Sequence, residues 1–402
     1  MPLLPPVDGA ISNLYTLAKR MNKIMKKYFY SSLVAGSLAG LLAGCSGDQS
    51  AAPADETTAG SSGKTEYLVT VTRPGSTINI VNMDNYTLEK QCDNGLAPGL
   101  GTLVMSPDNK VAYILANHAS DVYGISIDSC EMVFSTRQSE GNVRAKTMAG
   151  MAVSPDGKKI YTHQNRVRLM NDHYELLEPQ VAVFDTSAGL NVEASQTFPA
   201  PRQITTMSAL DSGDIILGGQ DIYQMDTATG EYSVILKSLN HEDPAYAPRD
   251  VLTFWPMDRI NNEFIRLYST ARWLGEPGDL NNAEWLWGYE WVNLSTGEAG
   301  SEIFGPLEVV LFSGARRPNH PEKMYATLNH LKEYDITNGT ETASIDLDHS
   351  YYTLNFSRDG EKIYLLGAAD DIAVFDANTL EKIVAIQLPG DGAVSNNVVF
   401  RK

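Results

Sequence analysis

The side chains that most often perform chemistry are scattered along this 402-residue sequence. Its seven histidines show neither His-x-His nor His-x3-His spacing, so we do not expect a zinc site. No Gly-x-Ser-x-Gly elbow, P-loop or dinucleotide fingerprint occurs in a strand-to-helix context. Cys-x-x-Cys-His is absent, so the chain attaches no c-type haem. These patterns predict a chain that binds no metal or cofactor and does no chemistry by itself.

Polar residues nevertheless precede several predicted strands. In "HSYYTLNFSRDGEKIY" (349–364), a histidine and two tyrosines stand where a plain strand would begin with Val or Ile. Counting back eight residues from the turn that ends each such strand reaches Lys146, Arg202 and His349, and Arg249 and Asp250 occupy the corresponding loop of a further repeat. We expect these residues around the mouth of a central channel, where they contact either a partner or only water.

The strands belong to an internal repeat in which an apolar strand is followed by Asp or Asn, a short polar turn and another strand. The repeated residue occurs seven times, at Asp84, Asp128, Asp185, Asp226, Asn293, Asp335 and Asp376. Most copies are separated by the period of about 40–45 residues that is typical of propeller blades. Turns such as Ser-Pro-Asp-Gly between alternating runs favour hairpins. The sequence therefore predicts an all-β fold, a seven-bladed β-propeller of four-stranded blades.

The two ends of the repeat region predict how the ring closes. "TEYLVTVTRPGSTINIVNMD" supplies the outer three strands of a blade but no inner strand, and "AVSNNVVFRK" at the C-terminus is an isolated inner strand. We therefore expect the C-terminal strand to pair into the N-terminal blade, which leaves only short, protected edges.

The N-terminal region predicts export. Residues 1–44 comprise an upstream extension and a signal peptide, with the true start at Met21 or Met25, because a basic start is followed by a short apolar stretch and then "LAGC". That last motif resembles the lipobox of bacterial lipoproteins, which implies a lipid on Cys45 and a periplasmic, membrane-anchored protein, with the outer membrane favoured. Residues 45–65 are then the lipidated cysteine and a flexible tether, and 66–402 the propeller.

Charge and cysteine content give two further expectations. The formal net charge of −18 excludes nucleic acid as a partner, and either favours a basic partner or serves only solubility. In an exported chain the two remaining cysteines, Cys92 and Cys130, can form one disulfide. All five tryptophans lie near the Asp226–Asn293 gap, where they pack between blades or form a docking platform.

Three stretches carry a family resemblance: "RVRLMNDHYELLEPQVAVFD" (166–185), "APRQITTMSALDSGDIILGGQDIYQMD" (200–226) and "HSYYTLNFSRDGEKIYLLGAADDIAVFDANTLEKIVAIQLPG" (349–390). With them the chain resembles the beta subunit of quinohemoprotein amine dehydrogenase, and more distantly the heavy chain of methylamine dehydrogenase. The likeness extends over roughly residues 66 to 400. The lipobox departs from the family, whose members we expect to carry an ordinary signal peptide.

The resemblance implies a heterotrimer that oxidatively deaminates small primary amines. A small subunit carries cysteine tryptophylquinone and a cytochrome subunit carries two c-type haems, whereas the propeller carries neither cofactor, holds the quinone subunit and helps to wall its active site. Matching residues, which the resemblance implies face the partner or the substrate amine, are Arg168, Arg202, Gln203, His349, Tyr351 and Tyr352.

Two other interpretations remain open. A stand-alone, membrane-anchored propeller lipoprotein would act as a binding or assembly scaffold. An autonomous propeller enzyme such as a lactonase would need metal-binding acids in its channel, whereas the predicted inner-strand starts offer Lys, Arg and His.

Overall fold

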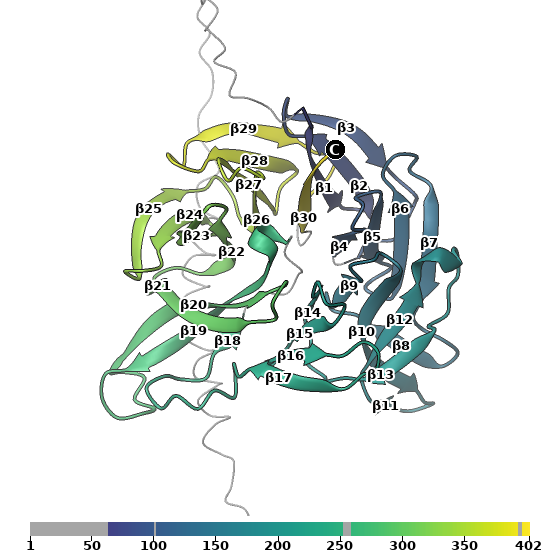
Figure 1. Ribbon diagram of the computed structural model, residues 1–402, viewed down its shortest axis with the longest axis horizontal. Helices are drawn as coiled ribbons and strands as arrows, with labels where there is room; N and C mark the ends of the chain where they lie inside the picture. Colours follow the sequence, from purple (N-terminus) through teal and green to yellow (C-terminus); the bar gives the residue numbers. More distant parts are fainter. Residues whose placement is uncertain (1–62, 100–101, 252–258, 393–395) are drawn as a thin grey trace, which may run out of the picture. The chain divides into compact units, whose positions relative to one another are not determined.

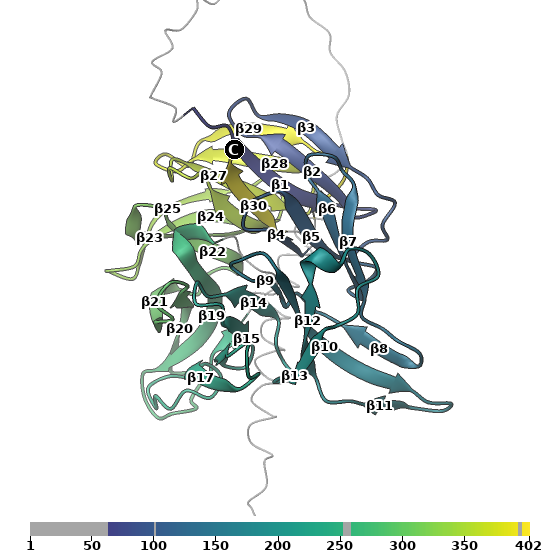
Figure 2. The same ribbon diagram turned by 45° about the vertical axis from the view of Figure 1, so that its right-hand side comes forward.

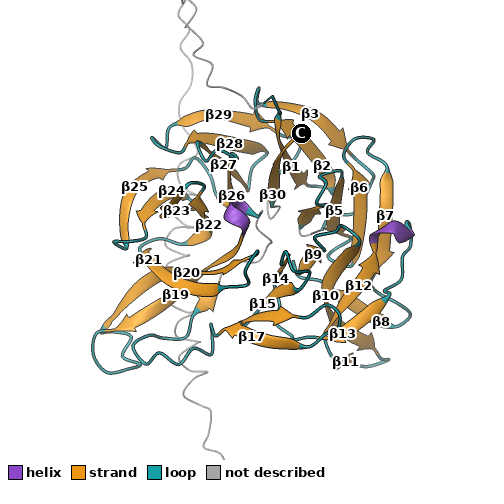
Figure 3. Cartoon of the chain, in the orientation of Figure 1, coloured by secondary structure: helices purple, strands orange, loops and turns teal. Residues whose placement is uncertain are grey.

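The computed structural model describes residues 63–99, 102–251, 259–392 and 396–402. These residues form strands and turns, with two short 3-10 helices, η1 (Thr186–Ala188) and η2 (Ile260–Asn262) (Figure 3). Within these ranges no helix has the length and apolar character needed to cross a membrane. The predictions for residues 1–44, for Cys45 and for nearly all of the tether lie outside the described residues.

Seven antiparallel sheets surround a central axis, as Figure 1 shows, so the predicted seven-bladed propeller is confirmed. We number the blades along the chain and give their strands in sheet order. Blades one to four contain β30 (Asn397–Arg401), β1 (Glu66–Thr72), β2 (Thr77–Asn82) and β3 (Thr87–Cys92); β4 (Leu103–Met105), β5 (Val111–Ala116), β6 (Asp121–Ser126) and β7 (Met132–Arg137); β9 (Met151–Val153), β10 (Lys159–Leu169), β12 (Gln180–Asp185) and β13 (Gln196–Pro199); β14 (Thr206–Ala209), β15 (Ile215–Gly218), β16 (Ile222–Met225) and β17 (Tyr232–Leu236).

The remaining blades follow the same plan. Blades five to seven contain β18 (Asp250–Val251), β19 (Glu263–Trp273), β20 (Ala283–Asn293) and β21 (Ala299–Pro306); β22 (Leu311–Arg317), β23 (His320–Leu328), β24 (His330–Asp335) and β25 (Thr340–Asp346); β26 (Tyr351–Phe356), β27 (Lys362–Gly367), β28 (Asp371–Asp376) and β29 (Lys382–Gln387). Two additional strands, β8 (Val143–Lys146) and β11 (Tyr174–Leu176), pair with the far end of β10.

The ring closes as predicted. The C-terminal strand β30 pairs antiparallel with β1, with Val398 opposite Val69 and Phe400 opposite Tyr67, and so supplies the inner strand of blade one. Cys92 and Cys130 form a disulfide that joins the outer strand of blade one to the turn after β6 in blade two. The first two blades are thus linked covalently beside the closure point.

The core consists of one apolar cluster between each pair of neighbouring blades. In the described part of the chain, Leu68 and Val399 of blade one pack with Ile372 and Val374 of blade seven, and six similar clusters occupy the other contacts. Burial of these side chains drives the sheets to pack radially. The tryptophan-rich strand belongs to this core, because Trp287 is buried in the contact between blades five and six.

The repeated aspartates act locally, in the turns. Oδ1 of Asp226 accepts hydrogen bonds from the backbone N–H groups of Ala228 at 2.7 Å and Thr229 at 3.1 Å, and Asp376 makes the same contacts in blade seven. Aspartate is favoured in such turns because its short side chain bonds to the backbone two residues on. The aspartate therefore recurs in the sequence because each blade needs the same turn.

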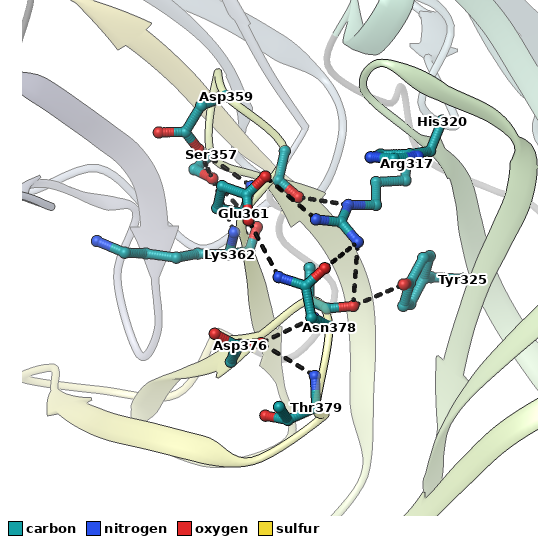
Figure 4. Close-up of polar contacts among 12 residues, drawn as sticks. Arg317, His320, Tyr325, Ser357, Asp359, Glu361, Lys362, Asp376, Asn378 and Thr379 are labelled. Carbon is teal, nitrogen blue, oxygen red and sulfur yellow. Dashed lines mark hydrogen bonds and ion pairs between the residues drawn. The ribbon is translucent and has the colours of Figure 1, made fainter. Parts of the chain in front are cut away.

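Polar contacts add to the apolar ones between blades six and seven, as Figure 4 shows. Arg317, which ends β22, is buried, and its Nε donates to the carbonyl oxygen of Gly360 at 2.8 Å. Its Nη1 donates to Oδ1 of Asn378 at 2.8 Å, and its Nη2 lies 3.3 Å from a carboxylate oxygen of Glu361. One guanidinium therefore connects two turns of the next blade.

Candidate functional site

The inner strands all begin on one face of the disc, because the blades repeat by rotation about its axis. We call this the start face. The connection from β10 to β12 lies on it as well, since β10 runs antiparallel to β9 and continues past Met151, where β9 begins. Loops and strand ends on this face carry nearly all the residues that the sequence singled out.

On blade seven, His349 and Tyr351 share an aspartate but differ in exposure. His349 Nε2 lies 2.9 Å from Oδ1 of Asp371, and the imidazole side chain is 27% exposed. The Tyr351 hydroxyl donates to Oδ2 of Asp371 at 2.9 Å, but this tyrosine is fully buried. Burial, together with the charge of Asp371, raises the pKa of Tyr351, so the phenol remains a hydrogen-bond donor. His349 is therefore the member of this group that a partner could reach.

Tyr352 lies between two blades. Its ring stacks on Phe312 of β22 with centroids 5.4 Å apart, and it is half-buried. This contact contributes to the packing of blade six on blade seven and leaves part of the ring exposed on the start face.

Blade three carries a structure that the sequence did not predict. β10 is 11 residues long and extends beyond β9 and β12, and its far end pairs with β8 on one side and β11 on the other. We call this three-stranded sheet the extension; Figure 2 shows it projecting beyond the neighbouring strands. It accounts for the long gap between Asp128 and Asp185. A signal was present, because residues 143–146 alternate between apolar (Val143 and Ala145) and cationic (Arg144 and Lys146) side chains.

Several predicted site residues gather around the extension. Arg168 lies on β10, where its Nη1 is 2.6 Å from Oε2 of Glu175. Arg202, in the loop before β14, donates from Nη2 to the carbonyl oxygen of Leu177 at 2.8 Å, and the neighbouring Gln203 is exposed. Lys146 ends β8 and does not directly precede the inner strand, and its Nζ donates to Ser120 Oγ of blade two at 2.7 Å. The structure thus brings Lys146, Arg168, Arg202 and Gln203 to blades three and four, across the channel from blade seven (Figure 1).

The remaining pair, Arg249 and Asp250, is largely enclosed. Arg249 Nη1 lies 2.9 Å from Oε1 of Glu290, Nη2 donates to Ser301 Oγ at 2.8 Å, and the guanidinium stacks on the Tyr268 ring at 4.7 Å. Glu290 is fully buried and also pairs with Arg266 at 2.6 Å. Burial raises the pKa of Asp250. Arg249, Glu290 and Arg266 form a largely buried charged network, and Asp250 is enclosed beside Arg249 in sequence, so this pair is not part of an open ring.

A small cavity of about 210 Å³ adjoins this network. Burial raises the pKa of Tyr268, in its wall, to about 12, so its hydroxyl is protonated at neutral pH. The volume is small compared with the roughly 300–1,000 Å³ of drug-sized ligand sites. The cavity is lined by His241, Asp243, Tyr246, Arg249, Tyr268, Thr270, Ser301 and Ile303.

A larger cavity of about 520 Å³ lies in the central channel, where the inner strands end. Strands β4, β9, β14 and β30 form its wall, and Asp211, Arg259, Arg358 and Arg401 line it. Arg259 Nη2 lies 2.6 Å from Asp211 Oδ1, and Arg401 Nε lies 3.2 Å from Glu66 Oε2. Within the described ranges no group of three or more His, Cys, Asp or Glu side chains is placed to hold a metal ion.

Comparison with known proteins identifies the fold. No protein-family model matches the chain. No curated protein matches it either. Among solved structures, it is similar to dihydro-heme d1 dehydrogenase NirN in complex with DHE, at 13% identity over 82% of this chain and 74% of that chain, with a TM-score of 0.50. Hydrazine synthase from Kuenenia stuttgartiensis gives 13% identity, coverage of 78% and 90%, and a TM-score of 0.48.

A third similar structure is apo AztD from Citrobacter koseri, at 10% identity, with 84% of this chain and 98% of that chain covered and a TM-score of 0.48. At 13% identity the likeness to NirN shows the fold alone. It does not separate an amine dehydrogenase subunit from other propellers, so that part of the identification stays a prediction.

Proposed function

We propose that this chain is the propeller subunit of a periplasmic quinohemoprotein amine dehydrogenase, in which it holds the quinone-bearing small subunit and walls its active site. One observation carries the proposal: each of the three stretches with the family resemblance contributes a segment to the start face. Residues 166–185 include the outer part of β10 and β11, residues 200–226 include the loop before β14, and residues 349–390 form blade seven.

In this proposal the chain supplies shape and no cofactor. Cysteine tryptophylquinone belongs to the small subunit and the two haems to a dihaem cytochrome c. Small primary amines are deaminated at the interface, where His349 is the accessible side chain of blade seven and Arg202 that of blade four. Packing on a rigid disc supports such a role, because a catalytic constellation tolerates little displacement.

The proposal also includes attachment to the membrane through a lipid on Cys45, with the outer membrane favoured. A Cys45→Ser variant should move the chain from the membrane fraction to the soluble periplasmic fraction. Unchanged fractionation of this variant would contradict the anchor and leave the enzymatic role open.

Isolation of the native complex from membranes tests the function. The expected preparation contains a quinone-staining small protein and a cytochrome, and a primary amine reduces its haem, seen in the visible spectrum. Recovery of a lone monomer without haem absorbance would instead favour a stand-alone scaffold lipoprotein.

A double variant, Arg202→Ala with His349→Ala, tests the participation of the start face. We expect complex formation or amine turnover to fall, while the free energy of unfolding changes by less than about 1 kcal/mol, as is usual for exposed sites. Lys158→Ala, an exposed cation in the turn that follows β9, is the control.

A further inference from the structure

The two faces of the extension differ in chemistry. Residues directly opposite each other in an antiparallel pair share a face, and the register places Leu176, Val167 and Arg144 in one row and Tyr174 opposite Leu169 in the next. Lys146, opposite Asn165, continues the same face. The other face carries Arg168 directly opposite Glu175, which agrees with their ion pair.

The first face is open to solvent. Tyr174 is 73% exposed and Leu176 is 71% exposed, whereas Ala145, which points the other way from β8, is fully buried. We call the first face the wall. Its strand residues include apolar side chains, Arg144 and Lys146. The exposed Glu178 lies just after β11, where the hydrogen bond from Leu177 N–H to the Arg166 carbonyl oxygen continues the pairing with β10. Groups of large, exposed apolar side chains are uncommon on monomeric soluble proteins and often mark an interaction site.

The wall stands beside the top of blade four. Further down β10, Tyr161 packs into the apolar cluster shared with blade four, and Val167 and Leu169 follow it at even spacing along the strand. Strands β15 and β16 are only four residues long, so they end well below the extension. The exposed residues Arg202, Gln203 and Gln220 lie in the loops that end there. Arg202 joins this floor to the extension through its hydrogen bond to Leu177.

Two cations of this corner bond to neutral oxygens in the described part of the chain. Arg144 Nη1 donates to the carbonyl oxygen of Gly141 at 2.8 Å, and Arg202 Nη2 donates to that of Leu177 at 2.8 Å. The ammonium of Lys146 instead reaches Ser120 Oγ of blade two at 2.7 Å. Elsewhere arginines more commonly lie against carboxylates, as Arg73, Arg259 and Arg272 do. In a chain of net charge −18, Arg144 and Arg202 are two cations of this corner that a partner could pair with.

We propose that this corner is the docking surface for the quinone-bearing subunit, which presents to it an apolar patch bordered by acidic side chains. This inference rests on the proposed function. Two of the three stretches that carry the family resemblance, 166–185 and 200–226, supply the wall residues of β10 and β11 and the floor residue Arg202. Tyrosine and arginine are enriched in the cores of protein interfaces, and complementary charge directs the encounter.

A lipid surface fits the corner less well. The tip of the β10–β11 hairpin is polar, with the Asp172 side chain 87% exposed, and insertion would strip that carboxylate of water. A flat bilayer also cannot contact a wall and a floor that meet at an angle. The overall negative charge further disfavours an anionic membrane.

The test compares the native complex of the full chain with two wall variants, the single variant Arg144→Glu and the double variant Tyr174→Ser with Leu176→Ser. Both should retain the unfolding midpoint and lose at least about tenfold in affinity for the purified quinone subunit, and wild-type affinity should fall with added salt. Lys158→Glu and Ile383→Ser are the matched controls, since Lys158 is an exposed cation on the opposite side of the disc and Ile383 is 45% exposed on β29.

Each outcome decides. Loss of affinity in the wall variants alone supports the docking surface. Unchanged affinity overturns it and leaves the amine dehydrogenase role intact, whereas absence of any quinone protein from the wild-type complex overturns both. If the Cys45→Ser chain self-associates and the wall variants abolish this, the corner belongs to an interface with a second copy. If the chain binds anionic vesicles and the wall variants abolish this while the complex still forms, the corner belongs to the membrane. Either result would overturn the proposal.

Discussion

The hydroxyl of Tyr364 in blade seven donates a hydrogen bond to Oε1 of Glu66 in blade one, at 2.8 Å and across 298 residues of sequence. The other oxygen of the same carboxylate accepts from the backbone N–H of Arg358 at 2.9 Å and from Nε of Arg401 at 3.2 Å. Glu66 is buried, so one carboxylate connects blade seven, β1 and the C-terminal strand at the point where the ring closes.

Replacement of Glu66 by alanine should therefore destabilise the closed ring. The variant leaves the buried Tyr364 hydroxyl without its acceptor, and we expect the free energy of unfolding to fall by about 2–3 kcal/mol. Urea unfolding followed by tryptophan fluorescence measures this. Glu193→Ala, at an exposed position, should change the free energy by less than about 0.5 kcal/mol, and equal midpoints for the two variants would contradict the role of Glu66.

Even a conservative substitution of Arg317 should destabilise the protein. Its guanidinium bonds to Gly360, Asn378 and Glu361 in two separate turns, and a lysine ammonium cannot span these oxygens. We expect Arg317→Lys to lower the free energy of unfolding by about 2 kcal/mol. Arg73→Lys, at an exposed pair with Asp391, should cost at most about 0.5 kcal/mol, and a similar loss in both variants would argue against a special role for the buried site.

Features held by local bonds could be read from the sequence. The repeated Asp bonds to the backbone two and three residues on, as Asp226 does. Each blade can therefore be recognised from a segment of about ten residues. The closing strand was likewise readable, because "NVVF" has no neighbour in sequence with which to pair. The blade count and the closure followed from these signals.

Features that depend on distant partners could not be read in this way. Arg249 looks like a free cation before an inner strand, but its partner Glu290 is 41 residues away on β20. The extension requires β8 to pair with β10 across more than one turn, and its exposed face follows only from the register. Tyr351 resembles a surface residue of a polar loop, but it packs in the apolar cluster between blades six and seven and its hydroxyl bonds to Asp371, 20 residues on.

Variants of His349 and Tyr351 should affect different properties: partner affinity for His349 and stability for Tyr351. Tyr351→Phe leaves the buried Asp371 without one donor, so we expect a loss of about 1–2 kcal/mol in the free energy of unfolding and no change in partner affinity at temperatures where the chain is folded. His349→Ala should do the reverse. Calorimetry and a binding assay on both variants check this, and a Tyr351→Phe chain of unchanged stability but weakened assembly would restore Tyr351 as a partner-facing residue.

His163 should make the stability of the propeller depend on pH. It is fully buried, its Nε2 lies 2.7 Å from the carbonyl oxygen of Pro201, its Nδ1 has no hydrogen-bond partner in the described part of the chain, and burial lowers its pKa to about 4. In the unfolded chain the His163 imidazole takes up a proton near pH 6.5, whereas in the folded chain it does so only near pH 4. Stability is therefore complete above pH 6.5 and is lost as the pH falls toward 4, by about 3 kcal/mol in all.

The variant His163→Gln keeps a donor for Pro201 and removes the titration. The difference in free energy of unfolding between wild type and variant should favour the wild type more at pH 7 than at pH 4.5. A flat difference would instead mean that the imidazole binds its proton equally well in the folded and unfolded chains, which would contradict the prediction. Because Pro201 directly precedes Arg202, the same titration should loosen the floor of the proposed docking corner before the whole ring unfolds.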